Sequence, residues 1–327
     1  MKELVIALLV VLILTIICGY ISIPLLKKLK AGQTILGYVK EHEKKNGTPT
    51  MGGLFFIIPT TIIFLVMDGG KSQVSLVALS VGLAFMIVGF LDDFIKVHYR
   101  KNQGLKAYQK IIFQVSVAVI VGVYCYNSQI DRFYIPFVNA QINMGIFTIP
   151  VVTLILLAIT NSVNLTDGLD GLAGQVSFVY LFFLSALILL QYENLKVLYL
   201  GAEEYQNLLL LSSCLMGGIL GFLLFNMNKA KVFMGDTGSL ALGGFLGAIS
   251  IFTSNGLFIP LLGIMFVVSS ISVIVQVAYF KKTKKRVFLM APLHHHFQLK
   301  GYTETQIGFV YSLVTAVCGL IAILSYL

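Results

Sequence analysis

Residues 146–191 read IFTIPVVTLILLAITNSV, then NLTDGLDG, then LAGQVSFVYLFFLSALILLQ, so a short polar segment lies between two apolar runs. The flanking runs, residues 146–163 and 172–191, have the length of helices that cross a lipid bilayer. Asp167 and Asp170 are each followed by a glycine, so the backbone between the runs can turn sharply or approach a ligand closely. Carboxylates this close to hydrocarbon are costly and usually mark a working site. The stretch therefore predicts two membrane-spanning helices joined by a functional loop.

The rest of the 327-residue chain repeats these apolar runs. Hydrophobic residues make up 57% of the sequence, charged residues make up only 11%, and the mean hydropathy is +0.91, which exceeds what a soluble core requires. We predict an all-α polytopic membrane protein that forms a single integral-membrane domain over residues 1–327. Its ten predicted transmembrane helices cover residues 4–26, 51–67, 74–91, 108–126, 146–163, 172–191, 205–225, 237–253, 257–280 and 306–327.

The cations are distributed unequally between the two sides of this arrangement. Of 23 lysines and arginines, 19 fall on the odd-numbered connections, and the exceptions are Lys2, Lys71, Arg132 and Lys196. The positive-inside rule then makes the odd connections cytoplasmic and both termini extracytoplasmic. Eight of the 14 acidic residues share the cytoplasmic face, which leaves it with a formal charge of +11. Many of these lysines need only set the topology, but a face this basic also attracts substrates that carry phosphates or carboxylates.

Two adjacent aspartates end the third predicted span. Residues 89–94 read GFLDDF and place Asp92 and Asp93 where that helix leaves the membrane. Successive helical residues point about 100° apart, so the two carboxylates cannot have identical roles. Either one of them faces a metal or a nucleophile while the other caps, pairs or orients, or both only mark the boundary. A boundary role for both is unfavourable without a compensating interaction, because carboxylates at a helix C-terminus oppose the helix dipole.

The eighth predicted span follows KVFMGDTGS at residues 231–239, with Asp236 just before the start of the helix. Free amides at a helix N-terminus bind phosphate, and a carboxylate there can hold magnesium between itself and the phosphate. The alternative is that Asp236 or Thr237 only caps the helix.

Two further polar segments fall on the predicted cytoplasmic face. Residues 290–297 read MAPLHHHF, and three consecutive histidines cannot easily bind one metal because their side chains diverge. The histidines could contact phosphate or transfer a proton, or they could serve only in packing. Residues 42–53 read HEKKNGTPTMGG, which is typical of an ordered turn and offers Lys45 and Thr50 as substrate contacts.

The loop motifs together carry a resemblance. TPTMGG at 48–53, FLDD at 90–93, NLTDGLDGLA at 164–173 and VFMGDTGS at 232–239 resemble the polyprenyl-phosphate N-acetylhexosamine-1-phosphate transferases. The histidine motif APLHHHFQLKG at 291–301 resembles the phospho-N-acetylmuramoyl-pentapeptide transferase branch rather than the N-acetylglucosamine branch. The resemblance spans residues 1–327.

The resemblance implies an enzyme of peptidoglycan synthesis in the bacterial cytoplasmic membrane, with its active site on the cytoplasmic face. Such an enzyme transfers phospho-MurNAc-pentapeptide from UDP-MurNAc-pentapeptide to undecaprenyl phosphate, giving lipid I and UMP, with Mg2+ as cofactor. We expect a homodimer in the lipid bilayer and no nucleic-acid partner. Because two anionic phosphates must meet, a divalent cation and basic side chains suit the reaction.

By the same resemblance, Asp236 is the first candidate for a magnesium ligand, and Asp92 and Asp93 assist the metal or activate the lipid phosphate. His294 is a further catalytic candidate, and Phe233 is expected to stack on uracil. The implied substrate-binding residues are Lys45, Thr50, Lys96, Asn164, Asp167, Gly168, Leu169, Asp170, Asn226, Phe233, Gln276, His294 and His295. Some relatives carry a glutamate on the ninth span, whereas residues 267–277 hold no acid here, and their serines are expected to bend the helix.

Two other functions stay open at this point. A GlcNAc-1-phosphate transferase shares all the motifs except the histidine pattern. A secondary transporter would use the aspartates for coupling ions, but transporter sites lie near the middle of the membrane, whereas these acids gather at one face.

Overall fold

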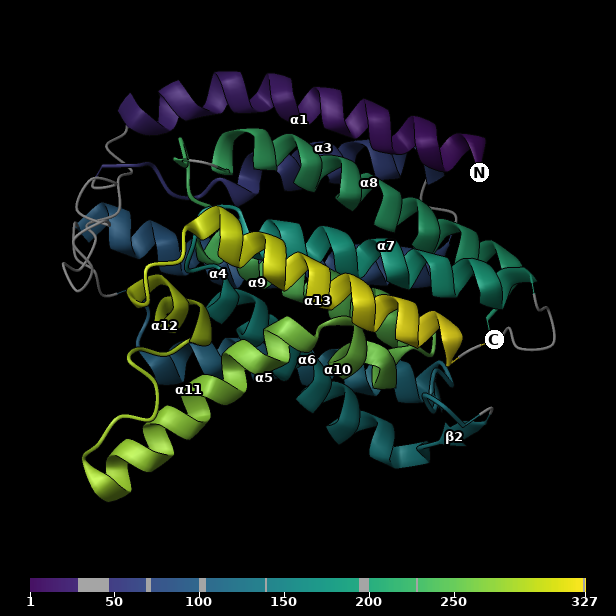
Figure 1. Ribbon diagram of the computed structural model, residues 1–327. Helices are drawn as coiled ribbons and strands as arrows, with labels where there is room; N and C mark the ends of the chain where they lie inside the picture. The colour runs from purple at the N-terminus through teal and green to yellow at the C-terminus, as the bar shows by residue number, and fades with distance from the viewer. Residues whose placement is uncertain are drawn as a thin grey trace.

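The computed structural model describes residues 1–28, 47–68, 72–99, 104–138, 140–193, 200–227, 229–325 and 327. Its helices run roughly side by side in one bundle (Figure 1). The long helices are α1 (Lys2–Lys28), α3 (Gly53–Asp68), α4 (Gln73–Tyr99), α5 (Ala107–Asn127), α6 (Thr148–Thr166), α7 (Leu172–Glu193), α8 (Ala202–Asn226), α9 (Gly235–Phe252), α11 (Ile264–Thr283) and α13 (Glu304–Leu324). The short elements are β1 (Arg132–Tyr134), β2 (Gln141–Asn143), η1 (Gly145–Phe147), η2 (Gly256–Phe258), α10 (Ile259–Leu262) and α12 (Leu293–Leu299).

The predicted all-α membrane fold is confirmed. Within the described residues, nine helices are long and apolar enough to cross a membrane, and α3 is a shorter apolar helix. Each of the ten predicted spans overlaps helix in the structure. Both termini lie at the end of the bundle that also carries β2, whereas α12 lies toward the other end (Figure 1). Which end faces the cytoplasm stays a prediction.

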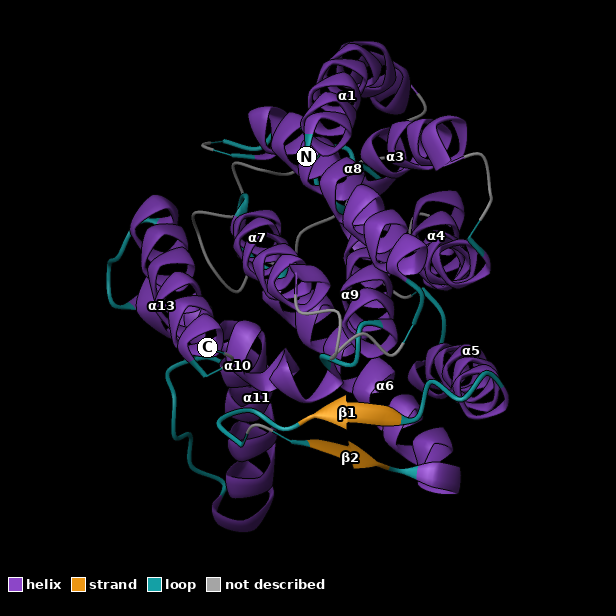
Figure 2. Cartoon of the chain, turned by 90° about the vertical axis from the view of Figure 1, so that its right-hand side faces the viewer, coloured by secondary structure: helices purple, strands orange, loops and turns teal. Residues whose placement is uncertain are grey.

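Helices α8 and α9 form the centre of the bundle, because most of their residues are buried. Seen from the end of the bundle, α9 lies between α4, α6 and α7 (Figure 2), and it also packs against α3. The crossing of α4 and α9 is close because Gly89 faces the α9 backbone, where an added Cβ would clash with the carbonyl oxygen of Asp236. This close crossing brings the aspartates of both helices to one place.

The structure differs from the sequence prediction at the end of α4 and in one pair of short strands. Helix α4 continues to Tyr99, so Asp92 and Asp93 lie within the helix rather than at its end. Helix α11 has no break at its serines, because it is continuous and the hydroxyls of Ser269 and Ser272 bond to carbonyls of their own helix; a bend there stays a prediction. The break comes at Gly263, between α10 and α11. An antiparallel pair of short strands, β1 and β2, was not predicted (Figure 2).

Candidate active site

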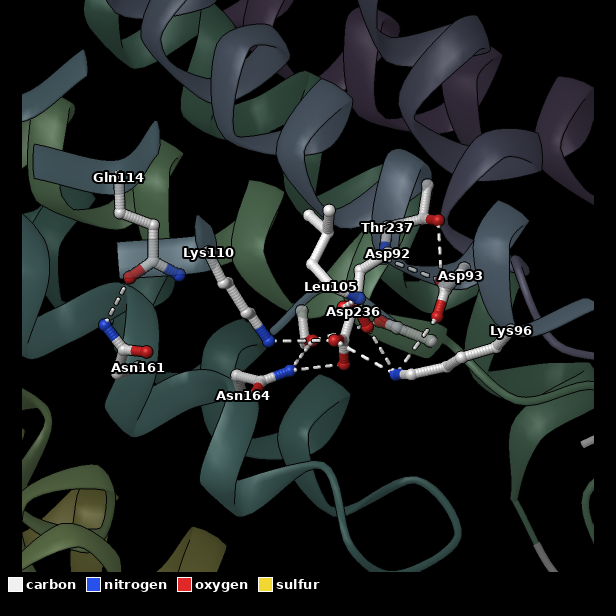
Figure 3. A network of polar contacts seen from close by, with 12 residues as sticks. Asp92, Asp93, Lys96, Leu105, Lys110, Gln114, Asn161, Asn164, Asp236 and Thr237 are labelled. Carbon is white, nitrogen blue, oxygen red and sulfur yellow. Dashed lines mark hydrogen bonds and ion pairs between the residues drawn. The ribbon is translucent and has the colours of Figure 1, made fainter. Parts of the chain in front are cut away.

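Three aspartates from two helices form the centre of the candidate site (Figure 3). Asp92 and Asp93 come from α4, and Asp236 lies in the first turn of α9. One carboxylate oxygen from each lies within 4.8 Å of the others, the spacing of a possible metal site. Asp92 and Asp93 are buried at 3% and 2% exposure, so their charges need partners.

Two lysines supply the compensating charge. Lys96, one helical turn beyond Asp92, places its Nζ 2.5 Å from Asp92, 3.2 Å from Asp236 and 3.9 Å from Asp93. Lys110, on α5, places its Nζ 2.8 Å from the same Asp236 oxygen that faces Lys96. Both ammonium groups are largely buried, with 21% and 18% of their side chains exposed. In this structure a lysine therefore lies among the three carboxylates, where a metal ion would also be attracted.

Neutral groups fix the direction of each carboxylate. Asn164, near the end of α6, donates from Nδ2 to Asp236 (2.8 Å) and to the Ser239 hydroxyl (2.8 Å). The amide and hydroxyl of Thr237 both donate to Asp93, at 2.9 and 2.7 Å. The backbone amide of Leu105 donates to Asp92 (2.8 Å). Each acid therefore keeps one oriented oxygen bonded to the protein.

The loop after α6 connects this centre to the histidines. Gly168 lies so close to α12 that an added Cβ would clash with the His294 imidazole and lie 3.1 Å from His295 Nε2. Desolvation, and then the negative charges of Asp236, Asp93 and Asp170, raise the pKa of Asp167 well above its ordinary value. A cation or a hydrogen-bonding ligand near Asp167 would relieve this destabilised charge.

The far side of the loop is bonded to three other segments. Asp170 accepts from the Ala230 amide, and its own amide donates to Glu304 on α13, both at 2.8 Å. Asn226 accepts from the Gly171 amide and donates to the Val232 carbonyl, both at 2.9 Å. Leu169 is buried between these contacts. In this structure Asp170 and Asn226 hold the loop in place.

The three histidines have different surroundings on α12. His294 is fully buried with its ring 4.4 Å from the ring of His295, and His295 Nδ1 lies 3.1 Å from Gln298 Oε1. His296 instead accepts from the Leu289 amide (3.1 Å), and its pKa is lowered by desolvation and by Lys300. His296 thus has different partners from the adjacent rings of His294 and His295. That the triplet does not bind one metal stays a prediction.

Three more predicted substrate contacts, Thr50, Phe233 and Gln276, lie around these segments. The chain at Phe233 pairs with the turn at Pro49 and Gly52, which brings Thr50 beside Gly235. Among the described residues the buried Thr50 hydroxyl has no hydrogen-bond partner. Gln276 bonds through both ends of its amide to the backbone of Val287 and Phe288, so here it shapes the loop that leads to α12. Lys45 lies outside the described residues.

The sequence reading missed Lys110, Thr237 and Ser239 as parts of the site. A signal for Lys110 was present, because this cation, counted above with the third connection, lies in the first turn of the predicted span 108–126, and a cation in a span calls for an anionic partner. Glu304, which bonds the loop at Asp170, carried no signal because its partner is distant in sequence.

Comparisons with known proteins define the class first. The family model for glycosyl transferase family 4 matches residues 75–254, which hold the three aspartates, Lys110 and Asn164. A signature of phospho-N-acetylmuramoyl-pentapeptide-transferases matches residues 45–57.

Curated relatives give the finer assignment. A phospho-N-acetylmuramoyl-pentapeptide-transferase of Clostridium perfringens (strain 13 / Type A) is 44% identical over 99% of this chain and 98% of its own length. Proteins of that name from Clostridioides difficile (strain 630) and Clostridium botulinum (strain Eklund 17B / Type B) are each 42% identical, over 97% and 95% of this chain and 96% and 93% of their own lengths. The chain belongs to the phospho-N-acetylmuramoyl-pentapeptide-transferase family, and the predicted resemblance is confirmed.

Proposed function

We propose that the protein transfers phospho-MurNAc-pentapeptide from UDP-MurNAc-pentapeptide to undecaprenyl phosphate, forming lipid I and UMP in peptidoglycan synthesis. The observation that carries this proposal is the convergence of three aspartates and two lysines at one place. Lys96 Nζ lies within 4 Å of all three carboxylates, and Lys110 Nζ lies 2.8 Å from Asp236. Family membership supplies the substrates. One pyrophosphate linkage is broken as another forms, so the reaction is nearly isoenergetic and reversible.

The donor set fits magnesium. Mg2+ prefers oxygen ligands at about 2.1 Å and is usually held by one or two carboxylates together with substrate phosphates and water. Two oxygens on one ion lie at most about 4.2 Å apart, and the three aspartate oxygens lie within 4.8 Å. Asp236 and one or both of Asp92 and Asp93 would hold the ion. When bound, magnesium neutralises phosphate charge and polarises the phosphoryl oxygens.

The lysines and the α4 aspartates have distinct tasks in this proposal. Lys96 and Lys110 bind the phosphate oxygens and stabilise the charge that builds up during transfer. Asp92 or Asp93 accepts the residual proton of the lipid phosphate, which is already largely ionised near neutral pH, so a modest base is adequate. Asn164 keeps Asp236 oriented throughout.

The segments beside the acids form the proposed nucleotide site. Gly168, next to Asp167, approaches His294 and His295. These four residues bind the nucleoside diphosphate, with His294 handling a proton or contacting phosphate. Phe233 stacks on the uracil. Lys45, Thr50, Leu169, Asp170, Asn226 and Gln276 complete the site, either by direct contact or by holding the loops.

The proposed setting is the cytoplasmic membrane of a bacterium, with the site on the cytoplasmic face and both termini outside. The excess of cations on the odd connections supports this orientation, because cytoplasmic loops retain positive charge. We also propose a homodimer, as implied by the family resemblance.

Purified protein in detergent with undecaprenyl phosphate and Mg2+ tests the function. UDP-MurNAc-pentapeptide should give UMP and a sugar-linked lipid, whereas UDP-GlcNAc should give neither, and no UMP should form without the lipid. Turnover of UDP-GlcNAc alone would establish the other transferase branch. Accumulation of labelled substrate in proteoliposomes without a lipid product would establish a transporter.

A further inference from the structure

A second binding feature lies on the side of α4 away from Asp92. Helices α1, α3 and α4 enclose a groove of about 910 Å³, comparable with the larger ligand pockets of proteins. Its walls are mostly apolar, and Leu25, Ile58 and Phe94 are 56%, 48% and 48% exposed. Within the described residues, none of the three site aspartates lines it. The groove is thus separate from the candidate active site.

The length of the groove matches one leaflet of a bilayer. Along α1 the lining runs from Cys18 to Lys28, and along α4 it runs from Phe90 to His98. At 1.5 Å per residue these stretches are about 15 and 12 Å long, close to half of a hydrocarbon core about 30 Å thick. An occupant of this length is a lipid chain rather than a small solute.

One end of the groove is polar and basic. Lys28 and His98 both line it there, and Lys27 precedes Lys28 in the last turn of α1. From His98 inward, the rings of His98, Phe94 and Phe90 stack in sequence along α4, at centroid distances of 5.6 and 5.9 Å and interplanar angles of 16° and 22°. A phosphate at the basic end would therefore continue into an acyl chain along an aromatic wall.

We propose that this groove binds one anionic glycerophospholipid, with its phosphate at Lys28 and His98 and an acyl chain along Phe94 and Phe90. The charge at the polar end selects an anionic headgroup over a zwitterionic one. The acceptor lipid is a poorer occupant, because its phosphate must meet the site aspartates, and none of the three lines the groove within the described residues. The bound lipid supports the outer face of α4, whose other face carries Asp92 and Lys96.

The chain contains no tryptophan, so one introduced tryptophan is an unambiguous reporter. Full-length Phe94→Trp places it in the groove, and Phe309→Trp places it on α13, where Phe309 is 64% exposed and outside the groove. Each variant is titrated in detergent with phosphatidylglycerol or phosphatidylcholine brominated on the acyl chains, and quenching of fluorescence is measured. Ile58→Trp is the second groove reporter if Phe94→Trp does not fold.

The expected result is saturable quenching of the groove reporter, with a midpoint at least fivefold lower for brominated phosphatidylglycerol than for brominated phosphatidylcholine. Adding Lys28→Gln and His98→Gln should remove that preference. The control reporter should show weak quenching that does not saturate and does not depend on the headgroup. Equal behaviour of the groove and control reporters would overturn the site, and so would equal midpoints for the two lipids. Displacement by undecaprenyl phosphate at lower concentration than by unlabelled phosphatidylglycerol would reassign the groove to the acceptor.

Discussion

Lys110 offers the sharpest test of the proposed active site, because its substitution should change two quantities in opposite directions. Three carboxylates and two ammonium groups give the cluster a formal charge of −1. Lys110→Gln makes this charge −2 while Asp236 keeps its contacts with Lys96 and Asn164. The variant should therefore fold, bind magnesium more tightly and turn over more slowly.

Both magnitudes follow from the geometry. A lysine and a divalent ion about 5 Å apart repel each other by about 1.7 kcal/mol even in a water-like dielectric, so removing the lysine charge should lower the half-saturating magnesium concentration roughly tenfold or more. Loss of one donor to a developing phosphoryl charge costs roughly 10²–10³ in kcat. The stability cost is bounded by one charge-assisted hydrogen bond, about 1.5–3 kcal/mol.

The assay is UMP release at saturating substrates over a magnesium titration. Lys106→Gln is the matched control, because it removes the same charge one turn earlier, where the side chain is exposed. The control should leave kcat and the magnesium curve near those of the unmodified protein. If Lys110→Gln keeps kcat within threefold and its magnesium curve coincides with that of the control, Lys110 has no part in the site.

Three further predictions use the same preparation. Asp92→Asn, Asp93→Asn and Asp236→Asn should each remain folded in detergent by size-exclusion chromatography but lose at least 10² in turnover, and near-normal rates in all three would refute the assignment. Gly168→Ala should force α12 outward at a cost in stability of about 1–3 kcal/mol, and it should raise the KM for the UDP-sugar roughly tenfold. The control Gly201→Ala, whose added Cβ meets open space, should leave the KM unchanged. Equal KM values for the two variants would show that α12 has no part in nucleotide binding. Because the pKa of Asp167 is raised in the folded protein, folding takes up a proton there and stability falls as pH rises above the ordinary aspartate range. Without magnesium or nucleotide, Asp167→Asn should remove this fall, so its thermal stability relative to the unmodified protein should rise with pH above the ordinary aspartate range, and parallel curves would contradict it.

The spans could be read from the sequence because a bilayer imposes a simple rule on it. About 20 apolar residues are needed for each crossing, and the chain meets this requirement along most of its length. The rule fails where the backbone leaves the bilayer. Helix α4 continues to Tyr99 although its apolar run ends at Leu91, because Asp92, Asp93 and Lys96 are solvated by one another rather than by water. A hydropathy profile counts each charged residue as polar even when a neighbouring residue neutralises its charge, so it ends the predicted helix too early.

In the site, too, residues in local sequence motifs were predictable, whereas residues that act through contacts distant in sequence were not. The motifs predicted Asp92, Asp93 and Asp236 as one group, and the structure brings their carboxylates together. The resemblance named Lys45 and Lys96 but not Lys110, because 19 basic residues share the predicted face and position alone does not rank them. Lys110 differs from the exposed Lys106 only through its contact with Asp236, which is 126 residues away in sequence.

The glycines beside the aspartates explain why the acids could be recognised without any knowledge of their partners. An added Cβ at Gly235 would clash with Asp93, and one at Gly104 would lie 2.5 Å from Asp92 Oδ1. Gly235 also has a φ of +73°, which other residues adopt only with strain. Close packing of backbone against carboxylate leaves no room for side chains around these acids, so the chain must place glycine where it approaches them. The glycine that begins the motif GDTG at 235–238 is thus required by the close approach of Asp93, a residue on another helix. The glycines make this motif easier to recognise in the sequence than any cation of the site.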